Sequence, residues 1–215
     1  MGRPSLPRAL SSIARQSHRP LEIVLVDASG SGLAPSPPAA IPMRVVQQGP
    51  LDRPRAANAG LEAATGAWIA FLDEDDELEP DHVASLLAAA TAAGTLAAYS
   101  QTQLLIEAGR PMRVFGGGPF SREALLRSNY LSIHSVLFSR RFVDEGFRFD
   151  GTFGMFEDWD FWLALSARGP FAFTGKATAL YHAGEGTSGA GGPGNLDRDA
   201  VLAQRERLMK KWLAR

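Results

Sequence analysis

The sequence predicts an α/β protein with a mainly parallel, doubly wound sheet that is flanked by helices in three layers. In the first half, apolar runs rich in Val, Ile and Leu alternate with Ala-rich segments of helical spacing. Segments rich in Gly and Pro separate these elements. One apolar run, residues 67–72, ends in consecutive acids at residues 73–76. This pattern is typical of a buried strand, and its acids would lie at the C-terminal edge of the sheet, where open α/β sheets bind ligands.

The first half of the chain supplies alternating helices and strands. Leu6, Leu10 and Ile13 share one helical face, which predicts the first helix. Gly66 and Gly94 follow two later helical segments, as is typical of helix ends. A loop rich in Gly, Pro and Ser is expected at residues 30–42. The expected helices cover 9–16, 55–64 and 80–93, and the expected strands cover 21–26, 43–47 and 67–72.

The second half has a different organisation. Residues 96–106 and 112–115 are expected to form a hairpin around a turn at 108–110. A glycine-rich segment at 184–194 is interpreted either as a lid over a bound donor or as a linker. The other expected elements are helices at 121–127, 156–167 and 195–213 and strands at 133–138 and 177–181.

Composition excludes several classes of protein. A chain of 215 residues with 45% hydrophobic residues is long enough for one domain with a substantial core. The net charge of −1 gives no indication of a nucleic-acid-binding surface. The absence of cysteine excludes disulfides and thiolate chemistry. No apolar run approaches the length of a membrane span, and the N-terminus lacks the apolar core of a signal peptide. These features predict a soluble, cytoplasmic protein.

The acidic run at 73–76 has two interpretations. Carboxylates this close repel each other and raise each other's pKa, and a divalent cation would remove that penalty. Hard oxygen ligands suit Mg²⁺ or Mn²⁺, which usually complete their coordination with substrate phosphates. The alternative is a solvated acidic turn that precedes the helix starting near Pro80.

Four motifs in order resemble family-2 glycosyltransferases with the GT-A fold. They are LEIVLVDASG at 21–30, RAANAGLEAATG at 55–66, DEDD at 73–76 and FEDWDFW at 156–162. The resemblance implies a single GT-A domain, with a nucleotide-binding half at 1–95, an acceptor-binding half at 96–194 and a C-terminal helix at 195–215. It also implies transfer of a sugar from a nucleotide-diphosphate donor, with a UDP-sugar expected, to a hydroxyl of a saccharide or glycolipid, with inversion.

The resemblance assigns donor-binding residues to the first two motifs. Asp27 would approach the nucleotide base, although a strand-terminal Asp can also cap the following loop. Ala28 stands where many relatives have a second Asp, so part of that contact would be absent. Arg55 would reach the base or the diphosphate, with an exposed helix surface as its alternative. Asn58 is also placed at the donor site, where it would stabilise the helix or the adjacent turn.

The resemblance also implies a metal site. Asp75 is expected to bind the cation directly, and Asp73 is expected to bind the ribose or the cation, with Asp76 assisting. Glu74 and Glu77 are expected to face solvent. His182 matches loosely a family histidine that helps to hold the metal or the diphosphate.

The last motif implies the catalytic base. Asp158 would take the proton from the acceptor hydroxyl, with Glu157 as the second candidate and helix capping as the non-catalytic alternative. Trp159 could stack on an acceptor sugar, whereas Trp162 is expected in the core. His134, which precedes an apolar strand, is expected in the core or in a pocket wall.

One family element is missing. Relatives begin with a strand, but residues 2–10 resemble the loop and helix that follow it, so the central strand of the sheet is expected to be absent. Two strand edges would then lack partners, unless a rearranged segment or a second copy in a homodimer filled the gap. This favours, as an alternative function, a non-catalytic homologue that binds nucleotide weakly or acts as an assembly partner. A nucleotidyltransferase is a further alternative, but its Gly-rich phosphate loop is not found.

Overall fold

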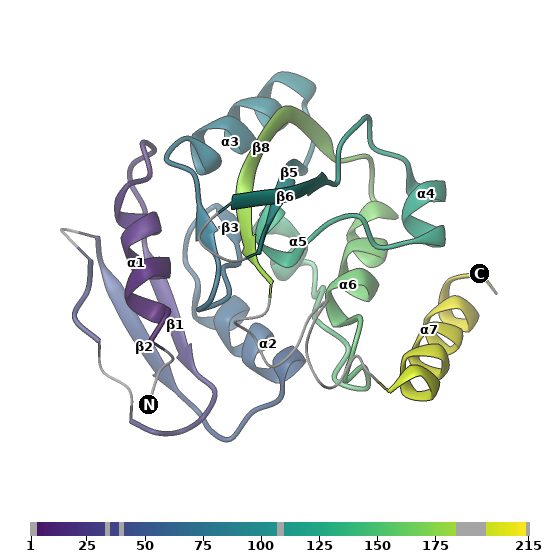
Figure 1. Ribbon diagram of the computed structural model, residues 1–215, viewed down its shortest axis with the longest axis horizontal. Coiled ribbons are helices and arrows are strands. Elements are labelled where there is room, and N and C mark those ends of the chain that lie inside the picture. Colours follow the sequence, from purple (N-terminus) through teal and green to yellow (C-terminus); the bar gives the residue numbers. More distant parts are fainter. Residues whose placement is uncertain (1–3, 33–34, 39–40, 107–109, 184–196, 214–215) are drawn as a thin grey trace.

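The computed structural model describes residues 4–32, 35–38, 41–106, 110–183 and 197–213. Strands β1 to β8 form two sheets with helices around them, and α1 lies beside β1 and β2 on the side of the molecule opposite to α7 (Figure 1). The helices are α1 (Leu6–Ala14), α2 (Arg53–Ala63), α3 (His82–Ala93), α4 (Arg122–Arg127), α5 (Arg141–Asp144), α6 (Glu157–Ser166) and α7 (Arg198–Leu213). The strands are β1 (Ile23–Asp27), β2 (Met43–Gln47), β3 (Trp68–Ala70), β4 (Glu77–Leu78), β5 (Ala97–Ile106), β6 (Arg110–Phe115), β7 (Val136–Ser139) and β8 (Ala172–His182).

The larger sheet is mixed rather than mainly parallel. Its strand order is β3-β7-β5-β8-β4, and β6 pairs with β5. Only β5 and β8 pair in parallel among the described strands of this sheet. The predicted α/β class is confirmed, but the predicted mainly parallel pairing is wrong here. The physical reason is that β7 lies between β3 and β5 and runs antiparallel to both. Strands β3, β5 and β8 therefore share one direction, whereas β4, β6 and β7 run in the other.

The predicted break in the sheet is confirmed. Strand β1 pairs with β2 in a separate parallel sheet, and β3 is at the end of the larger sheet, with β7 as its strand partner. No strand of the described residues joins the two sheets. The edges are not buried as expected, because Ala70 is exposed and Val24 and Val26 are partly exposed. Water can therefore reach parts of these strands, which lowers the cost of their unpaired backbone groups.

A side chain links the two sheets where no described strand joins them. The Glu22 Oε1 atom, just before β1, accepts hydrogen bonds from the Thr65 and Gly66 backbone N–H groups at 2.6 and 2.7 Å and from Thr65 Oγ1 at 2.8 Å. This carboxylate therefore connects the smaller sheet to the turn that leads into β3.

The apolar side chains form separate cores for the two sheets. The large core is rich in aromatic rings, and Phe149 stacks on Phe161 with ring centroids 4.1 Å apart. The smaller core contains Leu6 and Leu10, with Ile13 packed against it, as the helical pattern predicts. Apolar side chains of α1 and of the loop before β2 therefore stabilise the smaller sheet, and α2 also packs against β1.

Most predicted elements are present, and the differences follow from strand pairing. Residues 133–138 begin with a 3₁₀ turn at Ile133–Ser135 before β7, and β8 begins at Ala172 because it continues along β5. Strand β4 and helix α5 were not predicted. Gly94 adopts a left-handed φ of 63° after α3, as the predicted helix end requires. The glycine-rich segment 184–194 and most of the turn at 108–110 lie outside the described residues. None of the described helices is long and apolar enough to cross a bilayer.

Helix α7 is fixed to α6 by a buried carboxylate. Asp160 is 2% exposed, and it accepts hydrogen bonds from Lys211 Nζ and Trp212 Nε1, both at 2.8 Å. The Asp160→Ala variant is expected to lose about 3 kcal/mol of unfolding free energy, because the indole N–H and the ammonium group lose a buried partner. In a chain of this length that corresponds to a fall of roughly 6–12 °C in the thermal midpoint. Calorimetry checks this, with Glu206→Ala on the exposed side of α7 as the control. A midpoint unchanged from wild type would contradict it.

Candidate active site

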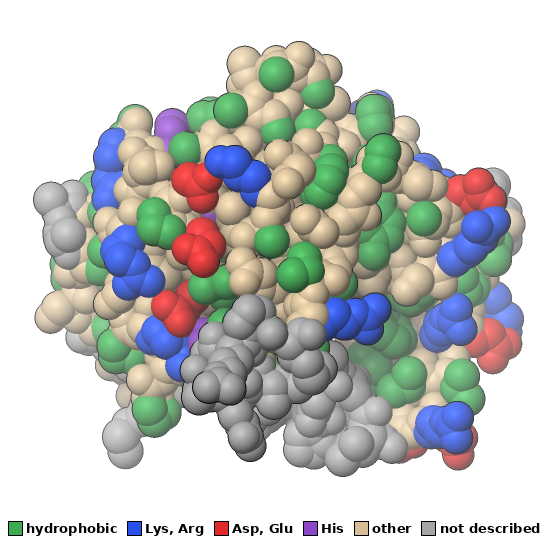
Figure 2. All heavy atoms as spheres, turned by 45° about the horizontal axis from the view of Figure 1, so that its top comes forward, with side chains coloured by type: hydrophobic (Ala, Val, Ile, Leu, Met, Phe, Trp, Pro, Cys, Tyr) green, Lys and Arg blue, Asp and Glu red, His purple; other side chains and the backbone are tan. Residues whose placement is uncertain are grey.

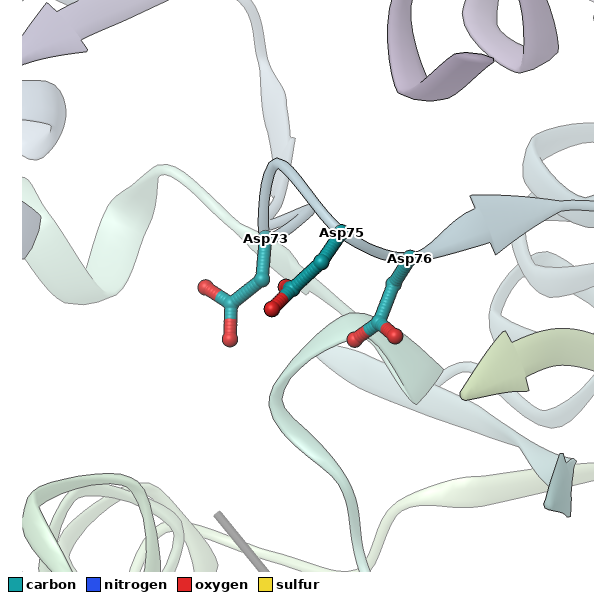
Figure 3. A group of neighbouring side chains, drawn as sticks. All are labelled: Asp73, Asp75 and Asp76. Carbon is teal, nitrogen blue, oxygen red and sulfur yellow. The ribbon is translucent and has the colours of Figure 1, made fainter. Parts of the chain in front are cut away.

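The acidic loop lies between β3 and β4. Asp73, Asp75 and Asp76 each offer a carboxylate oxygen, and these oxygens all lie within 4.8 Å of one another. Figure 3 shows the three side chains leaving one short loop and pointing to the same side. Asp73 and Asp75 are partly exposed, whereas Asp76 is 1% exposed. The donor set consists of hard oxygens on one side of a loop, which fits Mg²⁺ or Mn²⁺.

Asp76 forms the buried floor of this group. Its Oδ1 accepts the backbone N–H of His182 at 2.9 Å, and its Oδ2 lies 3.2 Å from His134 Nδ1. Burial, together with the charges of Asp73 and Asp75, raises the pKa of Asp76 to about 8. Burial lowers the pKa of His134 to about 4. Near neutral pH both side chains are therefore neutral, and His134 belongs to the wall behind the acidic loop.

The His182 imidazole does not join the three carboxylates. Its Nε2 lies 3.0 Å from Glu77 Oε1, while its backbone N–H contacts Asp76. Glu77 also pairs with Arg8 and Arg15, each at 3.3 Å, so it is part of an ionic network rather than facing solvent as predicted. Asp76 and Glu77 thus hold the end of β8 against the acidic loop. The metal-binding role of His182 stays a prediction.

The second acidic motif begins α6. Phe156, at the N-cap, has φ 66°, which is unusual for a residue other than glycine and turns the chain sharply before Glu157. Asp158 Oδ2 accepts a hydrogen bond from Asn129 Nδ2 at 3.2 Å, and Oδ1 accepts the Trp159 N–H at 2.7 Å. Burial and the neighbouring charge of Glu157 raise the pKa of Asp158 to about 7. The side chain remains partly exposed, so a partly protonated carboxyl is accessible to solvent.

Arg53 brings the two acidic motifs together. Its Nε donates to Glu157 Oε1 at 2.5 Å, and its Nη2 donates to Asp73 Oδ2 at 3.2 Å. Arg53 is in the first turn of α2, directly after the N-cap Asp52. The acidic loop and the start of α6, which are far apart in the sequence, are therefore parts of one site.

The predicted donor-binding residues have clear structural partners. Asp27 is 4% exposed and accepts hydrogen bonds from Ser29 and from the Gly32 N–H, which is the loop-capping alternative. Asn58 exchanges two hydrogen bonds of 2.9 Å with the backbone of Phe149. Arg55 is on the exposed surface of α2 and pairs with Asp52 at 3.6 Å. Their nucleotide contacts stay predictions.

Sequence reasoning missed some residues of the site and misplaced another. Arg53 and Asn129 were not selected, because an arginine before a helix and an asparagine in a loop carry no distinctive pattern. Trp159 is 3% exposed and donates through Nε1 to the carbonyl of Leu125, so it is a core residue and not a sugar-stacking surface. Trp162 is fully buried, as predicted.

The face shown in Figure 2 carries acidic and basic side chains in close alternation on its left side, without a large region of one sign. This agrees with the near-zero net charge of −1. Within the site, Arg53 pairs with Asp73 and Glu157, and Arg8 pairs with Glu77.

Comparison with known proteins points to one family. The model of the family "Glycosyl transferase family 2" matches residues 2–115. The chain is 32% identical over 228 aligned residues to the succinoglycan biosynthesis protein ExoO of Rhizobium meliloti (strain 1021), and the alignment covers 97% of this chain. The chain spans 65% of the length of that relative.

Solved structures show the same fold. The Staphylococcus aureus protein TarS, residues 1–349 in complex with UDP-GlcNAc, matches 97% of this chain and 67% of its own with a TM-score of 0.68 at 16% identity. TarS 1–349 without a named ligand matches 98% of this chain and 67% of its own, with a TM-score of 0.63 at 15% identity. The predicted GT-A fold is thereby confirmed, and the match to the family model shows that this chain belongs to glycosyl transferase family 2.

Proposed function

We propose that this chain is a metal-dependent, inverting glycosyltransferase that moves a sugar from a UDP-sugar to a hydroxyl group of a saccharide or glycolipid. The observation that carries the proposal is the contact of Arg53 with both Asp73 and Glu157. This contact places the carboxylate oxygens of the acidic loop, which suit a cation, in the same site as the Asp158 carboxyl, which is suited to proton transfer.

The donor half of the site is the acidic loop. Asp75 and Asp73 are partly exposed and would hold the cation that accompanies the donor diphosphate. A bound Mg²⁺ or Mn²⁺ would offset the negative charge that develops on the nucleoside diphosphate leaving group. Asp76 is buried behind them, and its hydrogen bond with the His182 backbone keeps the loop in place.

The acceptor half of the site is the start of α6. Asp158 would accept the proton from the acceptor hydroxyl as that oxygen forms its bond to the anomeric carbon and the bond to the diphosphate breaks. A single displacement of this kind inverts the anomeric centre. Glu157 is less suited to this role, because it is 5% exposed and already paired with Arg53. Asn129 orients the Asp158 carboxyl from the side.

The relatives suggest which substrates to try first. The TarS structure contains UDP-GlcNAc, and ExoO is a succinoglycan biosynthesis protein. A uridine nucleotide and a saccharide acceptor are therefore the first probes for this chain. The similarity in fold does not indicate which sugar the donor carries.

The decisive experiment is titration of the wild-type chain with UDP by calorimetry, with and without Mn²⁺, followed by assays of UDP release from UDP-sugars. We expect binding that strengthens at least about tenfold with Mn²⁺, because the cation screens the diphosphate from the carboxylates. Absence of binding to UDP and to every other nucleoside diphosphate, with and without the cation, would refute the proposal.

A non-catalytic homologue is the second candidate, and the break between β1 and β3 favours it. Among the described residues no strand joins β1 to β3, so that β1, which ends at Asp27, has a strand partner on one side only. This candidate predicts weak UDP binding without UDP release from any UDP-sugar. Turnover of a UDP-sugar would exclude it.

A further inference from the structure

We propose that Arg53 is an exchangeable counter-ion for the acidic loop, which holds Asp73 while the site is empty and opposes cation binding until a nucleotide diphosphate arrives. The inference rests on the proposed function for its ligands. It makes cation and nucleotide binding cooperative, because each would be weak without the other.

The two contacts of Arg53 differ in their surroundings. Glu157 is 7% exposed in its side chain, and its oxygen lies 2.5 Å from Arg53 Nε. Asp73 is 37% exposed in its side chain, and its oxygen lies 3.2 Å from Arg53 Nη2. The contact to Glu157 is thus short and largely shielded from water, whereas the contact to Asp73 is longer and open to solvent. An exchange of partners would therefore occur at Asp73.

The same carboxylate of Asp73 belongs to the group that would hold a cation. Its oxygen lies within 4.8 Å of oxygens of Asp75 and Asp76. Arg53 cannot lose its charge, since the carboxylates of Asp73 and Glu157 raise its pKa although burial opposes this. A divalent cation on Asp73 would therefore meet a fixed positive charge nearby, and this repulsion would lower its affinity.

A diphosphate would remove this opposition. It brings negative charge to the place where the cation and the guanidinium repel each other, and guanidinium groups bind phosphate oxygens well. Arg53 would then keep Glu157 and exchange Asp73 for a phosphate oxygen. The site would hold the cation firmly only when the nucleotide is also present.

The test is Mn²⁺ binding without nucleotide, measured by electron paramagnetic resonance, in wild type and in Arg53→Gln. The substitution removes the charge but keeps a polar, shorter side chain. We expect Mn²⁺ to bind Arg53→Gln about three- to tenfold more tightly. With Mn²⁺ present, UDP should bind Arg53→Gln at least about tenfold more weakly than wild type, because a charged phosphate contact is lost.

Two controls make the result specific. Arg168→Gln removes the same charge from an exposed position outside the site, where Arg168 pairs with Glu145, and should leave Mn²⁺ affinity unchanged. Arg53→Lys keeps the charge and should bind Mn²⁺ as wild type does. Arg53→Met, which also removes the charge, is the second variant if Arg53→Gln does not fold.

Opposite outcomes are distinguishable. The inference would be overturned if Arg53→Gln bound Mn²⁺ no more tightly than wild type, or if Arg53→Lys gained the same Mn²⁺ affinity as Arg53→Gln. Arg53 would then only hold the acidic loop and α6 together. Absence of Mn²⁺ binding in both wild type and Arg53→Gln would also overturn it. If Mn²⁺ binding responds as expected while UDP binds none of the proteins, the competition for Asp73 stands, but the coupling to a diphosphate and the proposed function both fail.

Discussion

The Asp75→Ala variant is expected to lose Mn²⁺-dependent UDP binding, with a fall in affinity of at least about 100-fold. Asp75 is a partly exposed member of the carboxylate group, and its removal leaves Asp73, which is shared with Arg53, and the buried Asp76. Asp76 is a poor substitute, because it is 1% exposed and its carboxylate already accepts the His182 N–H and faces His134. The remaining side chains would therefore hold a cation weakly.

Calorimetric titration of UDP in the presence of Mn²⁺ measures this loss. Glu62→Ala is the matched control, since it removes one negative charge from an exposed position on α2. The control should bind UDP as wild type does. If Asp75→Ala retained Mn²⁺-dependent affinity close to that of wild type, the acidic loop would be the solvated turn that the sequence left open as an alternative.

The Asp158→Asn variant is expected to lower kcat by about 10³-fold, within the range of 10²–10⁴ that general base catalysis contributes. Asparagine has nearly the same shape but cannot accept the proton from the acceptor hydroxyl. UDP affinity should change little, because Asp158 does not belong to the carboxylate group of the acidic loop. Steady-state rates with a UDP-sugar, together with calorimetry, separate the two effects.

The pH dependence gives a second measure of this residue. The catalytic form of Asp158 is the deprotonated one, and its pKa is raised to about 7 by burial and by Glu157. The wild-type kcat/KM should therefore increase about tenfold per pH unit below 7 and level off above it. The residual rate of Asp158→Asn should lack this rise. Equal profiles in both proteins would assign the base to another group, with Glu157→Gln as the next variant to measure.

The sequence predicted the local elements well, because their signals are local. The apolar face of Leu6, Leu10 and Ile13 and the glycine at position 94 each depend on neighbouring residues only, and the structure has the expected helix and helix end. The acids at 73–76 follow a strand, as the apolar run indicated, and three of them form one group. The resemblance of residues 2–10 to a loop and helix also predicted that no strand would join β1 to β3, and none does among the described residues.

Long-range packing was not predictable in the same way. Strand β4 exists because Glu77 and Leu78 pair with β8, about a hundred positions later, and such pairing leaves no pattern in two residues. Trp159 and Trp162 look alike in the sequence as aromatic residues of one helix. Both are buried: Trp159 donates to the Leu125 carbonyl of α4, and Trp162 packs against Phe138 in the large core.

The sequence by itself determined the family pattern, the order of its motifs and the residue types that the chemistry requires. Tertiary structure alone decided which of those residues meet: Arg53 joins Asp73 to Glu157, and His182 turns its imidazole toward Glu77. The physical reason is that strand and helix signals act over a few residues, whereas contacts between charged side chains depend on how distant segments pack. Local sequence signals therefore specify which residues the site contains, and the tertiary fold specifies which of them contact one another.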